Sequence, residues 1–90
     1  MTAHGGRQRF VTDMVAWLTR TLAPAGAVIT PHTPLFADGL INSIRILELI
    51  AWVELAIGCP IPDVRIRMDN FRTVERIADV FVGEEDDVAA

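Results

Sequence analysis

The chain has 90 residues, of which 51% are hydrophobic, and its eight Arg and twelve acidic residues give a net charge of −4. This length allows one domain with a modest core and excludes a two-domain enzyme. The negative charge has the wrong sign for binding a phosphate backbone, so we expect no nucleic acid partner.

Cys59 is the only cysteine, which excludes an internal disulfide and a thiolate-rich metal site. We interpret it as a small buried apolar residue. A single cysteine indicates either a reducing, cytoplasmic location or indifference to redox conditions, and we expect the cytoplasm. The longest apolar stretch, residues 44–57, is interrupted by Arg45, Glu48 and Glu54, and the first residues lack an apolar signal core. We therefore expect neither a membrane span nor a secretion signal.

The first predicted helix spans residues 8–22 and ends before Pro24 and Gly26. Its apolar residues recur at the three- and four-residue spacing of an amphipathic helix, at Val11, Met14, Val15, Leu18 and Leu22. Residues 23–42 then form a long first loop. Because the loop is rich in apolar residues, we expect it to be ordered and to lie over the helices.

The second predicted helix spans residues 43–57, with Asn42 or Ser43 as its cap and Gly58 at its end. One face is the predicted core face and carries Ile46, Leu49, Ile50, Val53 and Ile57. A second apolar face carries Ile44, Leu47, Ala51 and Leu55. Two interpretations stay open for this second face: the first loop covers it, or it is an exposed docking surface.

After Pro60 and Pro62, residues 69–72 predict a single helical turn, and Thr73 caps a last helix that Gly83 ends. The apolar side of this helix consists of Val74, Ile77, Ala78 and Phe81. We expect an ordered core over about residues 8–82 of a single domain, with flexible ends at 1–6 and in the acidic tail 84–90. The predicted fold is all-α: a small four-helix bundle of three main helices and one short helix.

Ser43 admits three interpretations at the start of the second helix. The common one is a helix cap. The second is the nucleophile of a Ser-His-Asp hydrolase with His32 as base. The sequence disfavours it, because no segment resembles a nucleophile elbow and we expect no substrate cavity in so small a domain. Covalent modification is the third, because a phosphate ester at a helix N-terminus meets backbone N–H groups and the positive end of the dipole.

His4 and His32 have no second ligand at metal-binding spacing, so we expect no metal site. Trp17 and Trp52 are interpreted as aromatic residues of the core or its rim. Arg65 and Arg67 are interpreted as part of a solvated loop that could also flank a partner's acidic patch.

Two sequence runs in this helical order, 38–44 (DGLINSI) and 70–74 (NFRTV), resemble the acyl carrier protein family of phosphopantetheine-binding carriers. The resemblance continues through residues 47–50 (LELI) and Glu54, and through Ile77 and Ala78, and it covers most of residues 35–82. It implies that Ser43 attaches a covalent 4′-phosphopantetheine. It also implies partner docking around the head of the second helix, through Asn42, Ile44, Arg45, Leu47, Glu48, Ala51 and Glu54.

Two positions depart from the family pattern. Asn42 stands where the family most often has Asp, and Arg45 stands where an acidic residue is common. These departures make the second helix less acidic than in fatty acid carriers and argue against a fatty acid synthase role. The runs at 38–43 and 70–74 look more like the free-standing carriers of specialised metabolism, of polyketide or nonribosomal peptide type.

The resemblance implies a non-catalytic, monomeric carrier that holds acyl or aminoacyl cargo as a thioester. Its implied partners are a phosphopantetheinyl transferase, a loading adenylating ligase or acyltransferase, and a downstream synthase. The alternative is a non-catalytic acidic helical interaction module without a cofactor.

Overall fold

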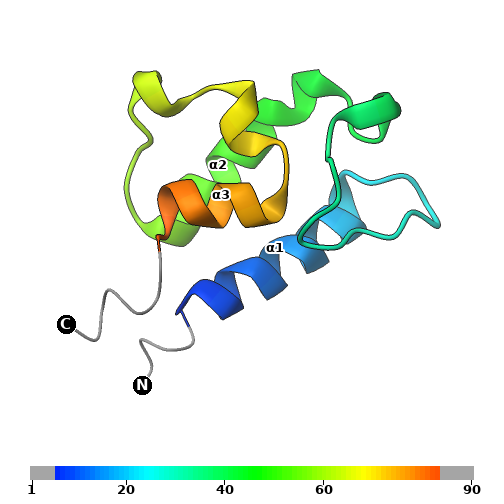
Figure 1. The fold of residues 1–90 in the computed structure, drawn as a ribbon, viewed down its shortest axis with the longest axis horizontal. Coiled ribbons are helices and arrows are strands. Elements are labelled where there is room, and N and C mark those ends of the chain that lie inside the picture. Colours follow the sequence, from blue (N-terminus) through cyan, green and yellow to red (C-terminus); the bar gives the residue numbers. More distant parts are fainter. Residues whose placement is uncertain (1–5, 84–90) are drawn as a thin grey trace.

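The computed structural model describes residues 6–83, and within them all regular structure is helical. The three α-helices are α1 (Gly6–Thr21), α2 (Ile46–Ile57) and α3 (Val74–Phe81), shown in Figure 1. Four short 3₁₀ turns complete the fold: η2 (Ala37–Gly39), η3 (Ser43–Arg45), η4 (Asp63–Arg65) and η5 (Met68–Phe71). The predicted small helical fold with a long first loop is confirmed. The expectations for His4 and for the tail at 84–90 lie outside the described residues.

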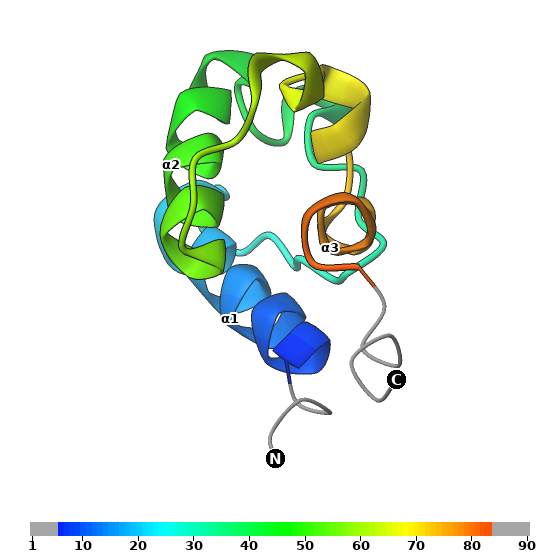
Figure 2. The same cartoon turned by 90° about the vertical axis from the view of Figure 1, so that its left-hand side faces the viewer.

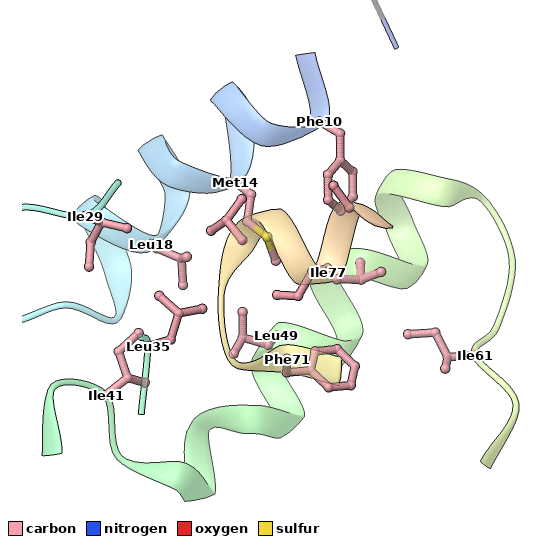
Figure 3. Close-up of a cluster of buried hydrophobic side chains, with 13 residues drawn as sticks. Phe10, Met14, Leu18, Ile29, Leu35, Ile41, Leu49, Ile61, Phe71 and Ile77 are labelled. Carbon is pink, nitrogen blue, oxygen red and sulfur yellow. The ribbon is translucent and has the colours of Figure 1, made fainter. Parts of the chain in front are cut away.

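The helices enclose a single core. In Figure 2, α1 lies at the base with α2 and α3 on either side above it, and the segment between α2 and α3 closes the top. Apolar side chains fill the space between these elements (Figure 3). The buried ones are Phe10, Met14, Leu18, Ile29, Leu35, Ile41, Leu49, Val53, Ile61, Phe71, Val74, Ile77 and Ala78.

The predicted helices form with small shifts at their ends. α1 begins at Gly6, two residues before the predicted start, and Phe10 adds a turn to the buried stripe of Met14 and Leu18. α3 begins after Thr73, whose hydroxyl accepts the Arg76 N–H at 2.9 Å, as predicted for a cap. Gly58 ends α2 in the left-handed conformation, with φ at 79°, also as predicted.

The first loop is ordered and contributes to the core, as predicted. Ile29, Leu35 and Ile41 are buried, whereas Val28 points outward and is 78% exposed. Backbone hydrogen bonds fasten the loop to the C-terminal third of the chain: Leu35 N–H to Arg72 O at 2.8 Å and Glu75 N–H to Pro31 O at 2.9 Å. The loop therefore holds the start of α2 in a fixed place.

Cys59 is exposed, so its interpretation as a buried residue was wrong. The left-handed Gly58 turns the chain away from the core after the last turn of α2, and Cys59 follows this turn. The interpretation of the two tryptophans is confirmed. Trp17 and Trp52 stack with ring centroids 5.7 Å apart, and both are half-buried against the core.

Candidate modification site

Asn42 caps the helical turn that carries Ser43. The Asn42 side-chain Oδ1 accepts the Ile44 N–H at 2.9 Å, and its backbone oxygen accepts the Arg45 N–H at 2.9 Å. The sequence left the choice between Asn42 and Ser43 open, and the structure assigns the cap to Asn42. Ser43 is therefore the first residue inside the helical segment.

The Ser43 side chain is exposed, and its hydroxyl makes no hydrogen bond to any described residue. The backbone N–H of Ser43 likewise donates to no described group. Asn42 accepts hydrogen bonds only from the N–H groups of Ile44 and Arg45. η3 runs directly into α2, so Ser43 lies at the positive end of one continuous helical segment. The site combines an accessible hydroxyl with a local environment that favours an anion.

The turn before Ser43 fixes the direction of the chain. Asp38 and Gly39 both adopt left-handed backbone conformations, with φ of 55° and 73°. Left-handed backbone is strained for a residue with a Cβ, although Asp tolerates it better than most. The turn brings Ile41 back into the core, where its N–H donates to Leu35 O at 3.0 Å. Burial of Ile41 holds the exposed Ser43 two residues later at the surface.

His32 does not lie in a triad with Ser43. Its Nδ1 is 2.6 Å from Glu75 Oε1, so it joins the first loop to α3. An open cleft of about 610 Å³ lies between α1 and the C-terminal ends of α2 and α3. However, neither Ser43 nor His32 lines this cleft, and aromatic residues such as Phe10, Trp52 and Phe81 do. The described residues also contain no group of three or more potential metal-ligating side chains.

The second apolar face of α2 is exposed. Ile44 is 74% exposed, Leu47 is 70% exposed and Leu55 is 84% exposed. Ala51, between them, is exposed as well. The interpretation that the first loop covers this face was wrong, because Leu35 and Ile41 of the loop belong to the core on the other side of the helix. The face leads from Ser43 along the whole length of α2.

The charged residues in the expected docking set are already engaged within the chain. Arg45 Nε is 3.5 Å from Glu48 Oε2, and Arg45 Nη2 also reaches the carbonyl of Thr21 at 3.5 Å. Glu54 is half-buried, and its Oε2 accepts the Ile61 N–H at 2.8 Å. The outer surface of α2 is thus predominantly apolar rather than acidic.

Sequence reasoning missed one exposed apolar surface. Val64, Ile66 and Met68 are exposed in the segment that follows Pro62. The available signal was their alternation with Arg65 and Arg67, the two arginines that were interpreted as part of a solvated loop or as flanking a partner's acidic patch.

No described helix has the length and apolar character needed to cross a membrane. No curated protein and no solved structure matches the chain significantly.

A family model does match, over residues 10–81, and its description is phosphopantetheine attachment site. The match spans most of the chain and includes α2, the loop before it and Ser43. The chain therefore belongs to the phosphopantetheine attachment family, whose domains carry a covalently attached 4′-phosphopantetheine.

Proposed function

We propose that Ser43 is the attachment residue and that the chain is a non-catalytic carrier of specialised metabolism. The observation that carries the proposal is the free, exposed hydroxyl of Ser43 at the start of a helix whose cap is supplied by Asn42. Ser43 is also the only serine in the chain. A serine that does not serve as the cap is available for modification without loss of the helix start.

The residues around Ser43 fit a phosphodiester. On attachment, Ser43 Oγ would attack the phosphorus of a pyrophosphate-linked phosphopantetheine donor. The new Oγ–P bond forms as the P–O bond to the donor's nucleotide phosphate breaks; the nucleotide leaves, and the hydroxyl proton passes to a base of the transferase or to solvent. The unengaged N–H of Ser43 and the dipole of the helical segment would stabilise the negative charge that remains on the phosphate. The attached arm supplies a terminal thiol that holds cargo as a thioester.

The apolar outer face of α2 supports a role in polyketide or nonribosomal peptide type metabolism. A partner that selects acidic carriers would find Glu48 paired with Arg45 and Glu54 bonded to Ile61. Leu47 and Ala51 instead offer apolar contact beside Ser43. Small, transient docking of this kind suits a phosphopantetheinyl transferase, a loading adenylating ligase or acyltransferase, and a downstream synthase, all in the cytoplasm.

Intact mass spectrometry tests the attachment. The chain is co-expressed with a broad-specificity phosphopantetheinyl transferase, and we expect its mass to rise by one phosphopantetheine group. Ser43→Ala should stay unmodified while its thermal midpoint remains close to that of the parent. Thr12→Ala, which removes another exposed hydroxyl, is the matched control and should be modified normally. Modification of Ser43→Ala would refute the assignment, and an unmodified parent would favour an interaction module without a cofactor.

A further inference from the structure

Residues 62–68, here called the strap, expose three large apolar side chains within five residues. Val64 is 81% exposed, Met68 is 44% exposed and Ile66 is 37% exposed. Scattered exposed apolar residues are common on proteins, but a group this dense usually marks an interaction surface. The strap lies outside the residues assigned to the modification site.

Two arginines alternate with these apolar residues, and neither forms an ion pair with a described carboxylate. Arg65 is exposed, and its side chain donates only to the backbone oxygen of Val80, at 3.0 Å. Arg67 is exposed and its side chain forms no hydrogen bond to a described residue. By contrast, Arg72 and Arg76 both pair with Asp69. The strap therefore offers two guanidinium groups that can still bind carboxylates.

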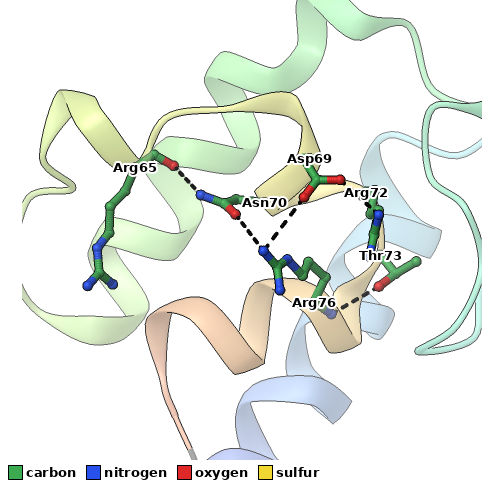
Figure 4. Close-up of polar contacts among 6 residues, drawn as sticks. All are labelled: Arg65, Asp69, Asn70, Arg72, Thr73 and Arg76. Atoms are coloured by element: carbon green, nitrogen blue, oxygen red, sulfur yellow. Dashed lines mark hydrogen bonds and ion pairs between the residues drawn. The ribbon is translucent and has the colours of Figure 1, made fainter.

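The strap is ordered by its own backbone. Arg65 N–H donates to Pro62 O at 2.9 Å, and Arg67 N–H donates to Arg65 O at 3.0 Å in a tight turn around Ile66, whose φ and ψ are −86° and 83°. Asn70 fastens the strap to the rest of the chain, because its amide donates to Arg65 O at 3.0 Å while its side-chain oxygen accepts from Arg76 (Figure 4). A surface fixed in this way loses little conformational entropy when a partner binds.

The strap and Ser43 lie along the same edge of the molecule. The turns η3, η4 and η5 all lie along the upper edge in both Figure 1 and Figure 2. Hydrogen bonds link the two regions, since Arg72, directly after η5, accepts from Leu35, and Leu35 accepts from Ile41. In Figure 1, η4 lies toward the left of this edge and η3 toward its right, so a partner that contacts both Ser43 and the strap must extend along the edge.

We propose that the strap is a docking surface for a protein partner that presents carboxylates around an apolar patch. This proposal rests on the proposed function, because the partner is one that acts on cargo held at Ser43. The charge of the strap is opposite to that of the chain as a whole, which is −4. Recognition would thus combine an apolar contact on α2 with an acidic contact on the strap.

A protein partner fits these observations better than an anionic membrane. The chain as a whole would be repelled by an anionic lipid surface. Asp63, at the start of η4, also forms no ion pair with a described residue and would face such a surface beside Val64. A protein can place its carboxylates opposite Arg65 and Arg67 and avoid Asp63.

The test uses a designed amphipathic helical peptide of Leu and Glu, and a matched peptide with Lys in place of Glu. Each is titrated into Ser43→Ala protein, so the result does not depend on whether Ser43 is modified. We expect the acidic peptide to shift the amide NMR signals of residues 62–68 and to bind more weakly as salt is added. The double variant Arg65→Gln/Arg67→Gln should lower its affinity about fivefold. Arg9→Gln, an exposed arginine on α1, should leave the affinity unchanged.

Three results would overturn the proposal. One is equal binding of the acidic and basic peptides. Another is a change of amide NMR signals near every exposed arginine, together with an Arg9→Gln control that binds the acidic peptide as weakly as the double variant does. The third is stronger binding of the protein to anionic phospholipid vesicles than to the acidic peptide. None of these results bears on the mass shift at Ser43, so the two proposals can fail separately.

Discussion

The two faces of α2 carry similar apolar side chains but lie in opposite environments. Leu49 and Val53 on one face are completely buried. Leu47 and Leu55 on the other face are 70% and 84% exposed. Both sets recur at helical spacing, so the sequence pattern alone does not distinguish them.

The difference is decided by what packs against each face. Leu49 and Val53 belong to the buried cluster that also contains residues of α1, α3 and the first loop. On the outer side, no described segment covers Leu47, although burying a leucine side chain contributes about 1.5–3 kcal/mol to stability. A small domain that leaves this contribution unused presents an apolar surface that a partner can bury.

Val53→Glu, on the buried face of α2, should have the largest effect on stability. The substitution places an unpaired carboxylate in an apolar interior where Val53 has no exposed surface, and we expect a loss of about 3–5 kcal/mol in the free energy of unfolding. For a chain of this size, such a loss leaves little folded protein. Urea denaturation followed by circular dichroism measures it. A loss below about 1 kcal/mol would show that the core face is not closely packed.

Glu54→Ala should have the next largest effect, because Glu54 joins α2 to the segment that follows it. The substitution removes the acceptor for the Ile61 N–H, and we expect a loss of about 1–2 kcal/mol. Glu54→Gln keeps an acceptor oxygen and should lose less than half as much. Glu48→Ala, which removes an exposed carboxylate, is the control and should change stability by less than about 0.5 kcal/mol. Equal losses at positions 54 and 48 would contradict the structural role of Glu54.

Local signals explain which parts of the fold could be predicted. Thr73 and Gly58 are a cap and a terminator whose roles depend on adjacent backbone, and both were predicted correctly. The inner face of α2 was predicted because burial follows the helical period. The left-handed Asp38 and the 3₁₀ turns at 37–39 and 63–65 depend on how the loops fold against the core, and the sequence did not indicate them.

At the candidate site, the sequence predicted the residues involved but not the contacts that depend on tertiary structure. Asn42 and Ser43 are both good caps, and only the observed backbone shows that Asn42 takes this role. Glu54 was expected at the docking surface from the family resemblance, and in the structure its carboxylate also accepts the Ile61 N–H at 2.8 Å. Cys59 was expected to be buried because of its residue type, although its position after a left-handed glycine exposes it.

Asn42→Ala should have a moderate effect that separates the cap from the modified residue. Loss of the side-chain acceptor for the Ile44 N–H should cost about 1 kcal/mol, whereas Ser43→Ala should cost less than about 0.5 kcal/mol. Asn42→Asp keeps the cap and should match or exceed the parent, because a carboxylate favours a helix N-terminus. Thermal unfolding of the unmodified proteins measures these differences. A larger loss of stability for Ser43→Ala than for Asn42→Ala would show that Ser43, not Asn42, is the helix cap.

Leu47→Glu, on the exposed face of α2, should have the smallest effect on stability and should slow modification by a partner enzyme. Because Leu47 is 70% exposed, the new carboxylate stays in water, and we expect stability to change by less than about 1 kcal/mol. The same charge would be buried against a docked enzyme, so the rate of phosphopantetheine transfer at subsaturating carrier should fall about tenfold. Val28→Glu, on an equally exposed loop residue, is the control and should be modified at the parental rate. If Leu47→Glu instead unfolded the protein but was modified normally whenever folded, the outer face of α2 would contribute to the core and the contrast between the two faces would not hold.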